Sequence, residues 1–443
     1  MTMAYSSRRA NANTIAIARQ SGPYTENTTD GDFAAVSAAF EFSDEQDQED
    51  QQLAAGQYGT SIAPAPGRKH ATWKLSGFLE GFKGGYDYTS DAANGSGVPS
   101  PVIALLANAL GSGGNAAVSS SAEFLSCYHA LPLSYVNGSV NAGGSTTTLV
   151  NVSDKDNYAA GAFVSWRTDA SETSQMAGFV KTIVDDVQDT IAPRAAIGAA
   201  PANGDDLAPS LTAYQSGETI VPMTIRRLGD NAAWKWSYIG CIPNKLTVMF
   251  GASKTIAWEM EGVALDRKRY STGGGLSNPT RYQRQRSFLG DNGGRFLVDG
   301  VATCGWHELK LEINWDIVAI ECPNATQGVS EYVRLLAAEN PITLTAIVPL
   351  QTGDTVSSGE DQWQAAHKAG TSFQIDAAVG TLPGQIFGFA MPAVQLAMAP
   401  KLVDHNGLDA YELVFRPAGY TGDTAAGSGS TAAIERAVAF GWA

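Results

Sequence analysis

The most regular hydrophobic pattern in the chain spans residues 308–317, where apolar and polar side chains alternate at every position. A period of two predicts a β-strand with one face in the core and the other in water. The two faces are Leu309, Leu311, Ile313, Trp315 and Ile317 against Glu308, Lys310, Glu312, Asn314 and Asp316.

Shorter alternating segments predict strands along most of the chain, so we expect a mainly β, antiparallel protein. The strongest hairpin joins residues 245–250 to residues 255–261. A final pair of strands, at 387–398 and 408–416, is expected to be joined by a turn at 404–407. Further strands are predicted at residues 14–19, 73–82, 161–166, 178–184 and 342–348.

Two segments carry helical spacing instead. In residues 101–110, Ser100 is placed as the N-cap, Pro101 as the first helical residue and Gly111 as the end. The apolar stripe of this segment predicts a helix that lies on a sheet with one face. Apolar residues three and four positions apart predict a second helix over residues 329–339.

The net charge of −15 at pH 7 argues against a nucleic-acid binder that works by neutralising phosphates. It does not exclude a surface along which nucleic acid slides. Residues 26–52 hold acidic residues and no Lys or Arg, which is typical of a solvated face or a mobile arm, or of a docking segment for a basic partner surface. The acidic candidates for contacts between subunits are Asp44, Glu45, Asp47, Glu49 and Asp50.

Basic residues gather in residues 266–295, which we predict to be a long glycine-rich loop. A solvated excursion and a contact with an acidic neighbouring surface fit this loop equally well, and direct DNA binding is the weaker alternative. Its cations are Arg267, Lys268, Arg269, Arg281, Arg284, Arg286 and Arg295, of which Arg281, Arg284 and Arg286 are the candidates for contacts between subunits.

These elements divide the chain into five parts. The first is an N-terminal strand, acidic segment and arm, and the second is the first part of a β-domain with a small β region inserted at about residues 138–240. The basic loop, the second part of the β-domain and a C-terminal tail follow. The boundaries are 1–70, 71–265, 266–295, 296–418 and 419–443.

No apolar run reaches membrane-spanning length, and residues 1–20 lack the apolar core of a signal peptide. We therefore expect a soluble protein, assembled in the cytoplasm, without a membrane partner. The four cysteines are widely spaced and form no CxxC pair, so buried free thiols are expected rather than a zinc or redox site.

Motifs of common enzymes are missing: the chain has no P-loop, no HExxH and no GxSxG. Its five histidines are scattered, and only His307 adjoins a carboxylate, Glu308, which faces the other side of the strand. We expect no enzymatic activity, no cofactor and no metal, with an unfamiliar enzyme as the remaining alternative.

The order of the parts resembles a tail tube protein of bacteriophages with long, non-contractile tails. The similarity covers most of the chain, and each piece is a packing pattern, so their order carries the resemblance. The pieces are the acidic N-terminal arm, Gln57-Tyr58-Gly59-Thr60, the strand at 73–82, the helix ending Ala107-Asn108-Ala109-Leu110-Gly111, the turn Ala200-Pro201-Ala202-Asn203-Gly204-Asp205, Pro209-Ser210-Leu211-Thr212 and the hairpin at 241–262. The basic loop and the tail after Ala418 look longer than in that family, which leaves their roles open.

The resemblance implies an antiparallel β-sandwich or barrel with one or two short flanking helices and long arms and loops between subunits. It also implies hexameric rings that stack into a hollow virion tail tube through which genomic DNA passes without specific binding. The implied partners are further copies of the chain and the tape measure, tail terminator and distal tail proteins. In such a tube we expect a net acidic lumen, for which Glu308, Glu312 and Asp316 are the candidates.

Two other functions fit a β-rich chain without catalytic motifs. One is a carbohydrate-binding or adhesive β-sandwich that stacks sugars on exposed aromatic side chains, and the other is a capsid decoration protein. A tube protein polymerises and shows no ligand, whereas a lectin-like module stays small and binds sugar.

Overall fold

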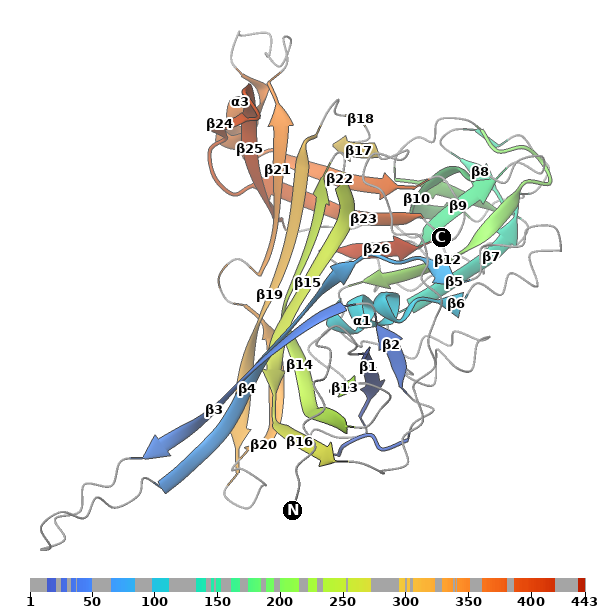
Figure 1. The fold of residues 1–443 in the computed structure, drawn as a ribbon. Helices are drawn as coiled ribbons and strands as arrows, with labels where there is room; N and C mark the ends of the chain where they lie inside the picture. The colour runs from blue at the N-terminus through green and yellow to red at the C-terminus, as the bar shows by residue number, and fades with distance from the viewer. Residues whose placement is uncertain are drawn as a thin grey trace, which may run out of the picture.

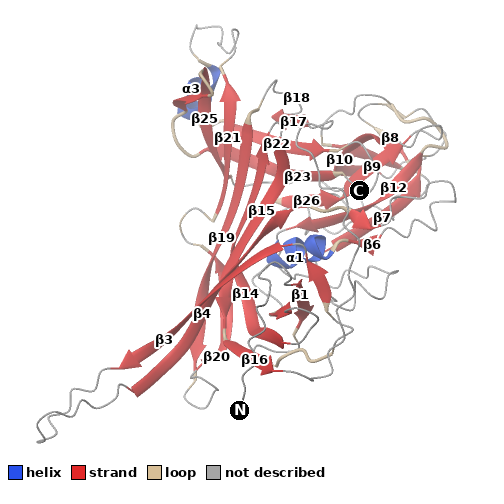
Figure 2. Ribbon diagram, viewed as in Figure 1, coloured by secondary structure: helices blue, strands red, loops and turns tan. Residues whose placement is uncertain are grey.

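The computed structural model shows a mainly β chain whose strands pair antiparallel (Figures 1 and 2). It describes residues 14–20, 25–29, 33–36, 38–49, 65–83, 98–110, 133–140, 145–146, 149–152, 161–167, 174–184, 189–194, 200–214, 222–228, 234–251, 254–271, 295–298, 301–302, 306–322, 329–337, 339, 341–350, 361–380, 386–418 and 437–442.

A long sheet forms one side of the molecule, and its strands run nearly the full length of the view in Figure 1. Every neighbouring pair in it is antiparallel. Its order is β3 (Ala38–Glu49), β4 (Ala65–Phe78), β15 (Lys254–Ala264), β14 (Trp234–Gly251), β19 (Glu308–Glu321), β21 (Ile342–Pro349), β25 (Leu408–Pro417) and β24 (Lys401–His405).

A second group of strands continues from the far end of β25 through β23 (Phe387–Leu396). On one side of β23 lie β22 (Ser372–Val379), β17 (Arg295–Val298) and β18 (Val301–Ala302). On its other side, β26 (Ala439–Trp442) leads to β12 (Asp206–Tyr214), β7 (Leu133–Ser139), β9 (Phe163–Arg167), β10 (Ser174–Val184), β11 (Thr190–Pro193) and β8 (Val150–Asn151). The strands of the inserted region are thus hydrogen-bonded into the same network as the last strand.

A third group forms on the first half of β14. It contains β13 (Met223–Leu228), β1 (Thr14–Arg19), β2 (Ala34–Val36) and β16 (Asp266–Ser271). Gly240 takes a positive φ of 67° within β14, a conformation that suits glycine, at the point where the strand passes from this group to the long sheet. A separate two-stranded pair joins β5 (Phe82–Lys83) and β6 (Val98–Pro99).

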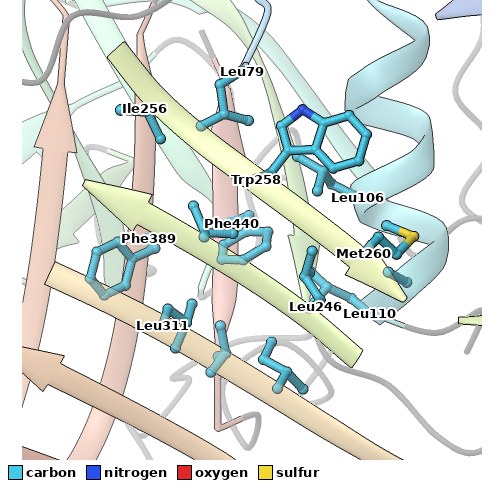
Figure 3. Packing of buried hydrophobic residues seen from close by; sticks show 14 of the residues in the cluster. Leu79, Leu106, Leu110, Leu246, Ile256, Trp258, Met260, Leu311, Phe389 and Phe440 are labelled. Carbon is cyan, nitrogen blue, oxygen red and sulfur yellow. The ribbon is translucent and has the colours of Figure 1, made fainter. Parts of the chain in front are cut away.

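One large hydrophobic core joins the inner face of the long sheet to the helix α1 (Pro101–Leu110) and to β23 and β26. Figure 3 shows this packing, with Trp258 beside Leu106 of α1, and Phe440 of β26 belongs to the same core. Strand alternation supplies the inward side chains, since residues two apart share a face.

The structure confirms the predicted strands at 308–317 and 342–348, the strand at 14–19 and the 245–261 hairpin. It also confirms the first helix: the amide of Val102 donates to Ser100 Oγ at 3.2 Å, as an N-cap requires.

The prediction that α1 buries only one face is wrong. Every described side chain of the helix is buried, because its sequence is almost entirely apolar and it lies in contact with β2, β12 and β14. The helix is therefore a part of the core rather than a cover on a sheet.

The second predicted helix is also wrong, because residues 329–336 form the strand β20 (Val329–Leu336). This strand pairs with the second half of β19, and its alternate residues Tyr332 and Arg334 point into the protein. In so short a segment, apolar residues at helical spacing fit either structure, and the available edge of β19 decides for the strand.

Three other boundaries differ from the predictions. The basic segment begins as the strand β16, the acidic residues up to Glu49 continue β3, and β24 lies between the two strands of the predicted final pair. The turn at 404–407 joins β24 to β25, with positive φ at Asn406 and Gly407.

The helix α3 (Gln362–Ala369) was not predicted. Asp361 caps it by accepting from the amides of Trp363 and Gln364, and Gly370 ends it with a φ of 62°. Both signals are present in the sequence.

Candidate functional site: the charged face of the long sheet

The alternation of β19 places its polar side chains on the face opposite the core. Leu309, Leu311 and Ile313 are fully buried, whereas Glu308 and Glu312 are half-buried and Asp316 is exposed. The three candidates for the lumen therefore share one face of one strand.

Neighbouring strands extend this face by their register. Glu312 lies opposite Thr247 of β14 and Thr343 of β21, and Thr247 in turn lies opposite Glu259 of β15. Directly paired residues of antiparallel strands point to the same side of the sheet. The result is a continuous polar surface, which we call the charged face. Its ionic residues include Lys74, Glu259, Glu261, Lys245, Glu308, Lys310, Glu312 and Asp316.

Lysines accompany the carboxylates of this face. Lys74 Nζ lies 2.6 Å from Glu259 and 3.4 Å from Glu261. The hydrogen bond that Lys74 donates to Glu259 is the main cause that raises the pKa of Lys74.

Glu312 lies between two cations. Its carboxylate is 3.0 Å from Lys310 Nζ and 3.3 Å from Lys245 Nζ. Burial alone would raise the pKa of Glu312, but the two ammonium groups outweigh it and lower the pKa. Glu312 is therefore a carboxylate held in its charged form.

Glu308 pairs with Lys254 at 3.5 Å. Glu308 and Glu312 thus have lysine partners, and the linear pattern did not predict the pairs with Lys245 and Lys254 because these two lysines come from other strands. The sign of the lumen charge stays a prediction, and these pairs make the face more neutral than its carboxylates alone suggest.

A second group of charges connects the acidic and basic segments within one chain. We call it the Glu26 cluster, and it consists of Glu26, Arg226, Lys268 and Tyr270. The Glu26 side chain is only 6% exposed and lies 3.9 Å from Arg226 and 3.6 Å from Lys268. The hydroxyl of Tyr270 donates to it.

Burial, followed by the hydrogen bond to Glu26, raises the pKa of Tyr270 to about 12. Arg226 also donates to the carbonyl of Asn27 at 2.6 Å and lies 3.6 Å from the ring centre of Phe33. Glu26 belongs to the segment expected to be solvated, so its burial corrects that prediction for this residue.

The cations of the basic segment whose side chains are described lie on β16, and Arg295 begins β17. Arg267, Lys268 and Arg269 are exposed, and the two guanidinium groups lie 4.7 and 5.6 Å from the ring centre of Trp236. Lys268 already pairs with an acid of its own chain, so this cation is not reserved for a neighbour.

Several candidates for contacts between subunits lie outside the described residues or side chains. The backbone of Asp44, Glu45, Asp47 and Glu49 lies in β3, and their side chains are not described. Asp50, Arg281, Arg284 and Arg286 lie outside the described residues. Among the described strands, β3 pairs only with β4.

The structure brings two scattered histidines together. The rings of His307 and His405 stack with their centres 4.6 Å apart and an interplanar angle of 16°. Within the described part of the chain, no group of three or more His, Cys, Asp or Glu residues could hold a metal ion. Cys241 and Cys322 are free thiols; Cys241 is buried as predicted, and its burial raises the pKa of the thiol, while Cys322 is half-buried.

Among the described helices, neither combines the length and the apolar character needed to cross a membrane. No family model matches the chain, and a search of curated proteins found no match.

Proposed function

We propose that this chain is a structural protein of a bacteriophage virion, which self-assembles into stacked hexameric rings that form the tail tube. The finer fold that we propose is the β-sandwich or barrel of tail tube proteins. The observation that supports it best is the long sheet, which commits one face to the core and presents charges on the other. The ordered sequence pattern of the resemblance adds to this support.

An open edge strand gives such a sheet a means of joining other copies. β3 is 12 residues long and pairs on one side only among the described strands, so its other edge can accept the backbone of a further strand. One contact, repeated between neighbouring copies, closes a ring. A different contact between rings lets the rings stack.

In the proposed tube, the charged face is the candidate wall of the bore. Carboxylates with lysine partners hold water and exert little net attraction on DNA phosphates, which suits a conduit for DNA during ejection. The proposed partners are copies of the chain, the tape measure, tail terminator and distal tail proteins, and DNA in passage. The proposal assigns the chain no catalytic role.

The test is assembly of the purified full chain. Sedimentation velocity over a wide concentration range and negative-stain electron microscopy should show rings and then tubes with a central channel. A particle that stays monomeric at every concentration, or that binds sugars on a glycan array, would contradict the tube and support the carbohydrate-binding alternative.

A further inference from the structure

The strands β3 and β4 continue beyond the long sheet as a pair. β15 pairs with residues 71–78 of β4, so residues 65–70 have β3 as their only described partner. We call residues 44–49 of β3 together with residues 65–70 of β4 the extension, and Figure 1 shows it projecting away from the other strands at the lower left. An isolated pair of strands is only marginally stable in water, which favours the addition of a further strand.

The two edges of the extension differ in charge. Residues 44–49 contain four acidic residues and no Lys or Arg, and among the described strands β3 pairs with β4 alone. The β4 side carries Arg68 and Lys69, and Pro66 interrupts it because proline cannot donate a backbone hydrogen bond. The β3 side is therefore the better edge for a further strand, and its charge complements a basic one.

The strand β16 is a basic edge strand. Residues 267–269 are Arg, Lys and Arg, all three are exposed, and among the described strands β16 pairs with β14 alone. Charges on an open edge repel strands of the same charge and so prevent indiscriminate pairing. An edge that is protected in this way still accepts a strand of the opposite charge.

The two arginines of β16 share one face of the strand, because residues two apart point to the same side. Their guanidinium groups, those of Arg267 and Arg269, lie 4.7 and 5.6 Å from the ring centre of Trp236, which holds them at the surface. Lys268 lies on the opposite face, where it pairs with Glu26. Among the described side chains, no carboxylate pairs with Arg269, so this face has positive charge that an anionic partner can neutralise.

Within one copy, the extension and β16 point in different directions. Both begin beside the end of β15, where Ala264 pairs with Ala71. From there β16 follows the first half of β14, which departs from the long sheet at Gly240, whereas the extension continues along the line of the sheet. The two diverge in Figure 1, so a contact that runs along both strands needs two copies.

We propose that the β3 edge of the extension of one copy adds as a further strand to the open edge of β16 of a second copy. The inference rests on the proposed function, in which copies contact one another, and it names the two strands of one such contact. Residues 44–49 and β16 are both six residues long, so backbone hydrogen bonds can run along the whole contact.

The two edges belong to different elements, so the contact is heterologous and repeats from copy to copy. It also gives a chain with a net charge of −15 a means of associating with itself, because an acidic edge meets a basic one.

Charge reversal at the two edges tests the contact. The β16 variant is Arg267→Glu with Arg269→Glu, and the extension variant is Asp47→Lys with Glu49→Lys. In each pair the two positions are two residues apart. The exchange variant carries all four changes, so that both edges are charged again with opposite signs.

A control variant separates the contact from the total charge. Lys181→Glu with Arg416→Glu changes two exposed cations of β10 and β25 and alters the net charge as much as the β16 variant does. Circular dichroism checks that every variant is folded.

By sedimentation velocity, the β16 variant and the extension variant should each need a concentration at least about tenfold higher than the unmodified chain to associate, because like charges then face each other. The exchange variant and the control should associate at about the concentration of the unmodified chain. Added salt should weaken association of the unmodified chain and strengthen that of the two reversal variants, since screening reduces attraction and repulsion alike.

Normal association of the two reversal variants would overturn the inference and leave the proposed function standing. If the β16 variant then lost retention on immobilised DNA, β16 would be a surface for nucleic acid instead. An exchange variant that associates no better than the reversal variants would also overturn the inference, because charge complementarity would not be the cause.

The proposed function can fail on its own. Rescue by the exchange variant, without tubes in electron micrographs of the unmodified chain, would support the contact and contradict the tail tube. A chain that stays monomeric at every concentration would contradict both.

Discussion

The Glu26 cluster allows a sharp test of how the N-terminal segment is held. Glu26→Gln keeps the size and most hydrogen-bonding capacity of the side chain and removes its charge. In the structure this charge faces Arg226, whose side chain is 3% exposed, and Lys268, whose side chain is 48% exposed. The change therefore removes an anion from beside one buried and one accessible cation.

The expected cost follows from the two contacts. Removing one member of a buried ion pair costs about 3–5 kcal/mol, and a hydrogen bond to a charged group contributes about 1.5–3 kcal/mol. Arg226 is 3.9 Å from Glu26 and keeps its bond to the carbonyl of Asn27, while water solvates Lys268 in part. We therefore expect a loss of about 2–3 kcal/mol, below the range for a fully buried pair.

Hydrogen exchange followed by mass spectrometry locates the effect. If the N-terminal segment opens locally, the amides of β1 should exchange about thirty to a hundred and fifty times faster in Glu26→Gln, since each 1.4 kcal/mol is a factor of ten. Glu41→Gln, at an exposed carboxylate of β3, is the matched control and should change nothing. Unchanged exchange in β1, or a change in unfolding free energy below about 0.5 kcal/mol, would refute the assignment of the cluster as an anchor.

Three further predictions concern single positions. Gly441→Ala should lower the free energy of unfolding, measured in urea titrations, by at least about 1–3 kcal/mol, because the new Cβ would lie 2.1 Å from Cγ of Phe163; a loss below about 0.5 kcal/mol would contradict this. Arg334→Ala should cost about 2–4 kcal/mol, through a cavity and the lost bond to Ala109, whereas Arg334→Met should stay within about 1.5 kcal/mol because it removes a buried charge at similar volume; equal losses would contradict this. The folded-state pKa of Tyr270 is raised from 10.0 to about 12, so its contribution to stability is complete below pH 10 and should fall as the pH rises from 10 to 12; in Tyr270→Phe this part of the alkaline loss should be absent.

The sequence predicted best where one physical signal dominates. The alternation at 308–317 fixes a strand and its inward face, because a one-residue slip would turn every apolar side chain to water. The same reasoning failed at β20, where eight residues satisfy both periods and the partner strand decides.

The charged contacts could not be predicted from the linear pattern, because their members come together only through the fold. Glu26 meets Lys268 across 242 positions of the sequence, and His307 meets His405 across 98. Local conformational propensities do not encode contacts between residues that lie so far apart in the sequence. The helix α3 differs, because its N-cap Asp361 and its C-cap Gly370 are both local features of the sequence. The cap residues therefore predict this helix even though its apolar stripe is weak.

The pairing of charges on the long sheet bears on how the proposed tube would treat DNA. Screening limits the reach of a wall charge to about 8 Å at physiological ionic strength, so local balance at the bore matters more than the total charge of the chain. Glu312 lies between Lys310 and Lys245, one carboxylate between two ammonium groups, so this group at the middle of β19 carries no net negative charge. In the proposed tube, the middle of each wall would therefore act chiefly as a hydrated surface of paired charges, and not as a source of strong repulsion of DNA.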